Sequence, residues 1–255
     1  MPIVAGIDAF REAMKGFEDS YVLIGGGACS ILFDDLGLSF RATNDLDIVV
    51  LSDSMDPAFG RVFWAFIREG GYECGRREDG TARYYRFSLP VESPLRGTYP
   101  SMIELLSRHP EFELAFPTSE IAPLPFDETT SSLSAIVLDD EYYAFIKDNV
   151  TVHNGVPLLT AIHIIPLKMR AHIDLHRRHA DGEHVSEKDL RKHRADVANL
   201  AGLLTPNSRM PLEGRLREDA LAFLDDFEEY ANRNANRKQR EHLGDVLSLL
   251  KAVYL

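Results

Sequence analysis

Residues 21–27 read YVLIGGG and residues 45–51 read DLDIVVL, and the apolar parts of both runs have the length of buried strands. The first run ends in three glycines, where a strand is expected to turn into a helix. The second run begins with two acids that are separated by one leucine. Because residues i and i+2 of a strand lie on the same face, we expect Asp45 and Asp47 to point together while Leu46 is buried.

The two runs together predict a metal-dependent nucleotide site. Carboxylate oxygens on one face of a strand suit one or two Mg²⁺ ions. Gly25 and Gly26 have no Cβ atoms, so their backbone N–H groups can approach phosphate oxygens closely. The N-terminus of the helix that follows adds a favourable potential for an anion. The alternative for Asp45 and Asp47 is a solvated strand end.

The composition is that of an ordinary globular protein. The 255 residues are 45% hydrophobic and 27% charged, which suits one large or two small domains. Only two cysteines occur and the sequence begins without a signal peptide, so we expect a cytoplasmic protein. The longest apolar stretch, residues 21–33, is too short to span a bilayer, and no membrane partner is expected. A net charge of −12 opposes nonspecific adhesion to nucleic acid, although a local basic patch could still bind it.

Hydrophobic periodicity predicts alternating helices and strands up to about residue 160. A β-hairpin is expected at Asn154-Gly155, which lies between two short apolar runs. Helices are expected at about 7–17 and 28–35 and from Asp56-Pro57 to a stop at Gly70-Gly71, and strands at 21–24, 47–51, 82–89, 101–107 and 132–138.

After about residue 160 the pattern is helical almost to the end of the sequence. Helices are expected at about 161–179, 186–204, 212–231 and 236–254. We therefore predict an α/β (α+β) domain over residues 1–160, with a mixed sheet and flanking helices. A helical C-terminal domain follows over residues 161–255, and the sequence has no internal repeats.

The strand predicted at 101–107 carries a single carboxylate, Glu104, between Ile103 and Leu105. If this strand lies beside that of Asp47, Glu104 supplies a third acidic ligand for a two-metal phosphoryl or nucleotidyl transfer. The alternative is a glutamate at a strand edge that faces water, because parity alone does not determine the face of Glu104.

These motifs resemble the nucleotidyltransferase superfamily and, within it, the AbiEii/AbiGii-type toxins of toxin–antitoxin and phage-abortive systems. The superfamily pattern is similar to Ile24-Gly25-Gly26, Asp45-Leu46-Asp47-Ile48 and Ile103-Glu104-Leu105, in that order. Residues 41–45 also resemble the approach to the acidic pair in the AbiEii-type relatives. The lysine and Lys-Asp elements of those relatives resemble residues 165–171 (IPLKMRA) and residues 188–191 (KDLR), which precede Asp196.

The resemblance implies a mixed sheet with flanking helices and a nucleotidyltransferase activity. A nucleotidyl group would pass from a nucleoside triphosphate to an acceptor, with Mg²⁺ or Mn²⁺ as the cofactor. RNA is an acceptor for toxin members, and a cognate antitoxin protein is the partner that a toxin–antitoxin context implies. The implied site residues are Asp45, Asp47 and Glu104 as catalytic metal ligands, Lys168 as a further catalytic residue, and Gly25, Gly26, Lys188 and Asp189 as nucleotide-binding residues.

Each basic element of the C-terminal half also has an ordinary interpretation. Lys168 could be a surface lysine, and Lys188-Asp189 could be a charge pair at a helix N-terminus. Residues 166–194 contain eight Lys or Arg against five Asp or Glu, so this segment could receive RNA or a triphosphate. The alternative is a solvated helix pair with mixed charges.

Three histidines, His172, His176 and His179, share one face of a predicted helix and could bind Zn²⁺. The sequence favours an ordinary helix face, because no cysteine or HExxH arrangement supports a zinc site and the neighbouring residues are basic.

The sequence thus predicts a nucleotidyltransferase and leaves two alternatives open. The first is a catalytically silent member of the same fold that binds a nucleotide or a protein partner, since a fold can persist without its chemistry. The second is a nucleotidyltransferase that acts on a small molecule such as an aminoglycoside. Motifs for other chemistry are missing: the chain has no Walker P-loop, no GxGxxG after the first strand and no GxSxG nucleophile elbow.

Overall fold

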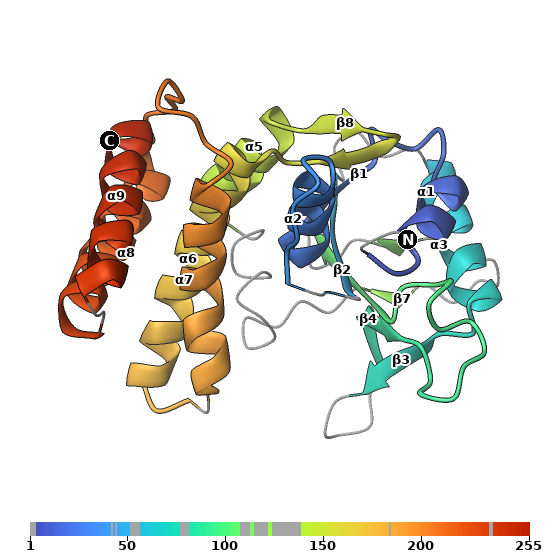
Figure 1. Ribbon diagram of the computed structural model, residues 1–255. Coiled ribbons are helices and arrows are strands. Elements are labelled where there is room, and N and C mark those ends of the chain that lie inside the picture. Colours follow the sequence, from blue (N-terminus) through green and yellow to red (C-terminus); the bar gives the residue numbers. More distant parts are fainter. Residues whose placement is uncertain are drawn as a thin grey trace. The chain divides into compact units, whose positions relative to one another are not determined.

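The computed structural model describes residues 4–41, 43, 45–51, 57–76, 82–107, 113–114, 122–123, 139–183, 185–234 and 237–255. The chain divides into two compact units, Met1–Leu159 and Thr160–Leu255, which we name the sheet unit and the helical unit. The sheet unit contains α1 (Ile7–Ala13), β1 (Tyr21–Ile24), α2 (Gly25–Asp34), β2 (Asp45–Val50), α3 (Pro57–Glu69), β3 (Glu73–Arg76), β4 (Ala82–Ser88), β5 (Met102–Ser107), β6 (Glu113–Leu114), β7 (Ala122–Pro123), α5 (Asp140–Asp148), β8 (Thr151–His153) and β9 (Val156–Leu158) (Figure 1). The helical unit contains α6 (Ala161–Ala180), α7 (Glu187–Ala201), α8 (Gly214–Asn234) and α9 (Arg237–Tyr254).

The sheet unit is built on a mixed sheet of seven strands in the order β3-β4-β5-β2-β1-β9-β8. The two acidic strands of the sequence analysis are neighbours, because β2 pairs in parallel with β5. On its other side β2 pairs antiparallel with β1, and β1 in turn pairs in parallel with β9. The prediction of a mixed α/β fold is thereby confirmed.

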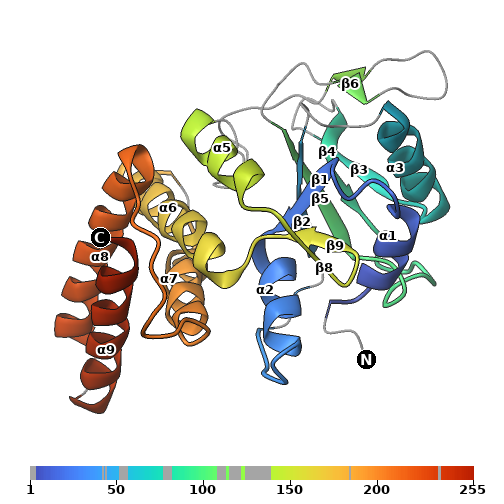
Figure 2. The ribbon, with the colours of Figure 1, turned by 90° about the horizontal axis from the view of Figure 1, so that it is seen from above.

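One face of this sheet is covered by α1 and α3, which lie side by side in Figure 2. The contact is largely aromatic: the ring of Phe10 in α1 meets those of Tyr21 in β1 and Phe66 in α3, each with 5.5 Å between centroids. Phe59 of α3 stacks on Tyr21 at 5.9 Å. Aromatic side chains bury a large apolar area, so this face forms the core of the sheet unit.

The predicted hairpin is confirmed. Asn154 and Gly155 join β8 to β9 and have φ angles of 49° and 79°. Positive φ at both central residues is what a type I′ turn requires, and asparagine followed by glycine is the pair that adopts it most readily.

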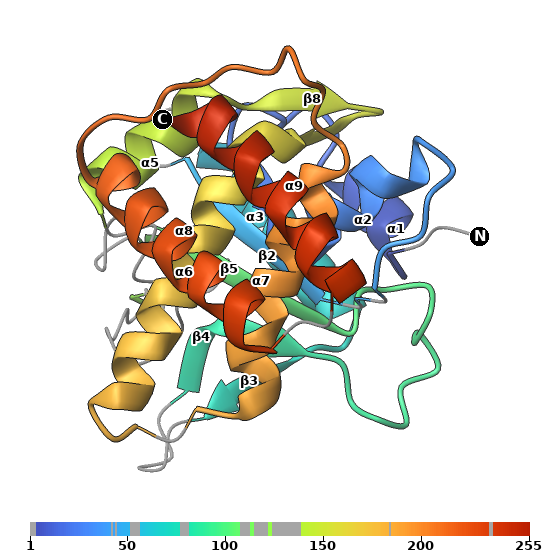
Figure 3. The ribbon, with the colours of Figure 1, turned by 60° about the vertical axis from the view of Figure 1, so that its left-hand side comes forward.

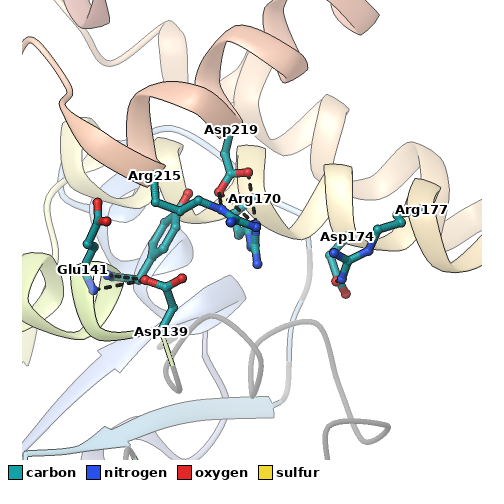
Figure 4. Close-up of polar contacts among 8 residues, drawn as sticks. Asp139, Glu141, Arg170, Asp174, Arg177, Arg215 and Asp219 are labelled. Carbon is teal, nitrogen blue, oxygen red and sulfur yellow. Dashed lines mark hydrogen bonds and ion pairs between the residues drawn. The ribbon is translucent and has the colours of Figure 1, made fainter.

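Several boundaries differ from the predictions. The first helix ends at Ala13 and not near residue 17, and α2 begins at Gly25 itself and not after the glycines. The periodicity did not predict β3 or α5, although Asp139 caps α5 by accepting hydrogen bonds from the backbone N–H groups of Glu141 and Tyr142 (Figure 4). The strand predicted at 132–138 lies outside the described residues.

The helical unit is a bundle in which α6 packs against α7 and α8, and α9 packs against α7 and α8 (Figure 3). The helix α6 contains an internal proline, Pro166, which has no N–H to donate to the carbonyl of Ile162. The hydroxyl of Tyr254, at the end of α9, donates a 2.8 Å hydrogen bond to that carbonyl. The first turns of α6 are therefore connected to the last turn of α9.

Within the part of the chain that the structure describes, no helix combines the length and the apolar character that crossing a membrane requires.

Candidate functional site

The register between β2 and β5 gathers three carboxylates on one face of the sheet. Asp47 pairs with Glu104 and Asp45 pairs with Met102. Paired residues of neighbouring strands point to the same face, so Glu104 lies on the face of Asp45 and Asp47. The face of the sheet on which Glu104 lies, which the sequence left open, is therefore the face of Asp45 and Asp47. We name Asp45, Asp47 and Glu104 the acidic face.

The opposite face carries the core. Leu46 and Ile48 are fully buried, and Ile48 is paired with Leu23 of β1. Tyr21 has the same parity as Leu23 and contacts α1 and α3 through its aromatic ring. The alternation of acidic and apolar residues in β2 thus separates the carboxylates from the apolar core.

The three carboxylates differ in their exposure. Asp45 and Asp47 are half-buried, whereas Glu104 is only 4% exposed. Glu104 is paired in register with Arg86 of β4, whose Nη2 lies 3.5 Å from Glu104 Oε2. Arg86 could not be identified from the sequence, because its position opposite Glu104 depends on the register between β4 and β5. This arginine neutralises the most deeply buried acid of the acidic face.

Gly25 lies directly beside the acidic face. Ile24 is the antiparallel partner of Asp47, and α2 begins at the next residue, where φ is 69°. A Cβ atom added to Gly25 would lie 1.9 Å from Asp47 Oδ2, so any side chain at this position collides with the Asp47 carboxylate. The glycine is required both by its left-handed backbone and by the close approach of Asp47.

Gly26 is covered by two side chains from the segment that precedes β2. A Cβ atom at Gly26 would lie 3.0 Å from Thr43 Oγ1 and 3.4 Å from Arg41 Nη2. The side chain of Ile24, the N-cap residue of α2, makes no capping hydrogen bond. The start of α2 therefore combines helix N-terminal backbone donors, a nearby arginine and a neighbouring carboxylate.

The oxygens of the acidic face are not gathered as tightly as ligands around one ion. Among the described residues, one group of three histidine, cysteine, aspartate or glutamate side chains has ligand atoms that all lie within 4.8 Å of one another. It consists of His172, His176 and Asp226 in the helical unit. The acidic face is thus a row of carboxylates on adjacent strands, with Glu104 directed toward Arg86.

Lys168 lies in α6 and is not a surface lysine. Its Nζ lies 3.1 Å from Asp196 Oδ2 of α7, and the two residues are 3% and 1% exposed. Burial, followed by the positive charge of Lys168, holds the pKa of the adjacent His193 well below its ordinary value. The ammonium of Lys168 is therefore neutralised within the helical unit by Asp196, the aspartate that follows the KDLR element of residues 188–191.

Lys188 and Asp189 lie in the first turn of α7 and are exposed. The N-cap residue Ser186 accepts a hydrogen bond from the Asp189 backbone N–H at 3.1 Å, and its hydroxyl donates to Asp189 Oδ2 at 2.6 Å. Asp189 thus takes part in capping the N-terminus of α7.

The basic segment 166–194 is partly neutralised inside the helical unit. Arg170 donates two hydrogen bonds to the Asp219 carboxylate, at 3.1 and 3.0 Å, and both residues are buried (Figure 4). Arg177 pairs with Asp174 at 2.9 Å in the same view.

A cavity of about 480 Å³ lies among α7, α8 and α9, and its lining includes Arg191, Arg194, Phe227, Tyr230 and His242.

Comparison of the chain with protein-family models, with curated proteins and with solved structures finds no significant match. The functional interpretation therefore depends on the chain's own residues.

Proposed function

We propose that the chain is a nucleotidyltransferase, similar to the AbiEii/AbiGii-type toxins, that transfers a nucleotidyl group from a nucleoside triphosphate to an acceptor. One observation carries this proposal. Asp45, Asp47 and Glu104 share one face of two adjacent parallel strands, and the Asp47 carboxylate lies against Gly25 at the start of α2.

The acidic face fits Mg²⁺ or Mn²⁺ in its chemistry, because both ions prefer oxygen ligands. Asp45 and Asp47 would hold the ion, and both are accessible enough to exchange water for it. Glu104 would become the third ligand by breaking its ion pair with Arg86, in which Arg86 Nη2 lies 3.5 Å from Glu104 Oε2. When bound, the ion would neutralise the charge that develops on the triphosphate.

The start of α2 would hold the phosphates. The side chain of its N-cap residue, Ile24, makes no capping hydrogen bond, and the helix dipole favours an anion there. In the transfer, the acceptor's hydroxyl oxygen bonds to the α-phosphorus while the bond from this phosphorus to the bridging oxygen breaks. Pyrophosphate leaves, and the hydroxyl proton passes to a carboxylate of the acidic face. The assignments of Lys168 to catalysis and of Lys188 and Asp189 to nucleotide binding stay predictions.

RNA is the acceptor that we favour over a cationic small molecule. Lys188 is exposed in the first turn of α7, and a cation of this kind attracts the phosphates of RNA. Arg177 and Arg191 are also exposed, and their surface ion pairs with Asp174 and Glu187 are weak enough to exchange for phosphate contacts. A cognate antitoxin is the protein partner that the same proposal includes.

A silent nucleotide-binding protein is the second candidate. The ion pair between Glu104 and Arg86 favours it, because a carboxylate that stays with an arginine leaves only two acids for the metal.

The test measures cation-dependent transfer from each α-labelled nucleoside triphosphate to total cellular RNA and to an aminoglycoside. The wild type is compared with Asp45→Asn/Asp47→Asn and with Glu92→Gln, a matched control at an exposed acid. Transfer that is lost only in the double variant supports the enzyme, and the labelled acceptor decides between RNA and the small molecule. Triphosphate binding without transfer supports the silent protein, and absence of both overturns the nucleotide site.

A further inference from the structure

Two histidines of α6 and one aspartate of α8 form a compact group in the helical unit. His172 and His176 are one helical turn apart, and their ring centroids lie 4.1 Å from one another. Asp226 approaches from the neighbouring helix, and its Oδ2 lies 2.8 Å from His172 Nε2. Each of the three residues offers one ligand atom, and these atoms all lie within 4.8 Å of one another.

The group is largely shielded from water. His172 is fully buried, and His176 and Asp226 are half-buried. The ring of Phe223 meets His172 edge-on at 5.2 Å and forms an apolar wall on this side. A carboxylate and imidazole rings that are largely removed from water need hydrogen-bond donors or a cation as partners, because unpaired polar groups are costly in such a setting.

His176 presents a nitrogen lone pair for which the described residues provide no donor. Its Nε2 is buried without a hydrogen-bond partner. A neutral histidine coordinates a metal through one ring nitrogen while the other carries the proton, so a buried Nε2 without a partner is suited to coordination.

We propose that His172, His176 and Asp226 bind a divalent transition-metal ion, with Zn²⁺ as the reference case. Two imidazoles and one carboxylate are a ligand set that Zn²⁺ and neighbouring first-row ions accept, with a fourth position left for water. This site differs in chemistry from the acidic face, whose ligands are all oxygens, and it does not depend on nucleotidyl transfer.

The geometry requires only small adjustments. Metal–ligand bonds of about 2.0–2.1 Å place neighbouring ligand atoms of a tetrahedral site about 3.4 Å apart. The pair His172 Nε2 and Asp226 Oδ2, now at 2.8 Å, would therefore open by roughly half an ångström. The metal would replace this hydrogen bond: the shared proton would pass to water, and the neutral His172 ring would carry its proton on Nδ1 while it coordinates through Nε2.

Arg194 forms an ion pair with this group. Its Nη1 lies 3.5 Å from Asp226 Oδ2, and its guanidinium also stacks on the ring of Tyr230, 3.5 Å from the centroid. The stacking holds the arginine independently of the aspartate, so Asp226 can turn toward a metal while Arg194 stays in place. Arg194 competes with the metal, and its removal should strengthen metal binding.

The experiment is a titration of the full chain with Co²⁺, followed through the visible absorption of tetrahedral cobalt, with Zn²⁺ as a competitor. The wild type should bind one Co²⁺ per chain. His176→Gln and Asp226→Asn should weaken binding by more than about tenfold, and Arg194→Gln should tighten it. His179→Gln is the matched control, because His179 is exposed on the same helix and lies outside the group.

Far-UV circular dichroism checks that each variant is folded. His172 is fully buried, so the test depends on His176 and Asp226, which are more accessible. As a second readout, Zn²⁺ should raise the midpoint of thermal unfolding in the wild type and in His179→Gln but not in Asp226→Asn. Asp45→Asn/Asp47→Asn should still bind Co²⁺, which separates this site from the proposed enzyme. Wild-type protein without saturable binding, or equal binding in His176→Gln, would overturn the site.

Discussion

The hydroxyl of Tyr254 donates a 2.8 Å hydrogen bond to the backbone carbonyl of Ile162. In an uninterrupted helix this carbonyl would accept from the N–H of the residue four positions later, but that residue is Pro166. A side chain from the far end of the helical unit therefore replaces the missing helical hydrogen bond. Burial raises the pKa of Tyr254 well above its ordinary value, so the hydroxyl keeps the proton that it donates.

Tyr254→Phe should lower the free energy of unfolding by about 1 kcal/mol, because it removes one hydrogen bond and leaves the packing unchanged. Urea denaturation followed by circular dichroism measures this loss. In a Pro166→Ala background the alanine N–H can reach the Ile162 carbonyl, so the same Tyr254→Phe change should cost less. An equal cost in both backgrounds would show that the tyrosine does not compensate for the proline.

Gly25→Ala should be more destabilising than Gly16→Ala. Both glycines have positive φ, 69° and 86°, so alanine at either position meets a backbone strain of about 1–2 kcal/mol. A Cβ at Gly16 meets nothing within 4 Å, whereas a Cβ at Gly25 lies 1.9 Å from Asp47 Oδ2. The difference between the two unfolding free energies measures the contact with Asp47. Adding Asp47→Ala to Gly25→Ala should recover part of it, and no recovery would contradict the contact.

Lys168→Met should cost about 3–5 kcal/mol, because it leaves the Asp196 carboxylate buried without its counter-ion. Lys168→Met/Asp196→Leu should cost less than Lys168→Met alone, since both charges are then removed. The matched control is Lys251→Met, which breaks the exposed ion pair with Glu228 and should cost less than about 1 kcal/mol. Equal costs for Lys168→Met and Lys251→Met in urea denaturation would contradict this account of the buried pair.

The helical unit should lose stability as the pH falls below about 6.5, the ordinary pKa of histidine. His193 has a pKa well below that value, first through burial and then through Lys168, so it stays neutral in the folded state. The unfolded chain binds a proton there that the folded chain does not, which favours unfolding at low pH by up to about 1.4 kcal/mol per pH unit. His193→Gln should show a shallower dependence in urea denaturation between pH 7.5 and 5.5, and an unchanged slope would refute this role.

The shared face of Asp45 and Asp47 could be predicted because its geometry is local. The order Asp45-Leu46-Asp47 determines which side chains share a face once the segment is a strand, and no distant residue changes that parity. The partner of Glu104 could not be predicted in this way. Arg86 reaches it through the register of β4 against β5, which depends on the connection between the two strands.

In the helical unit, too, contacts between elements could not be predicted from the sequence. Periodicity placed Lys168 on a helix but did not indicate its burial, because its counter-ion Asp196 belongs to another helix. The spacing of the α6 histidines indicated a shared face, yet the carboxylate beside them comes 54 residues after His172. Contacts between helices depend on how the bundle packs, and no sequence period encodes them.

The pairing of β1 with β9 has a consequence for synthesis on the ribosome. All four residues of β1 are buried, and Leu23 is the partner of Leu158 in the last strand of the sheet unit. Until Leu158 has left the exit tunnel, this side of β1 has no strand to pair with. A nascent or truncated chain that stops short of β9 therefore exposes an apolar strand edge, which is a template for aggregation with other chains.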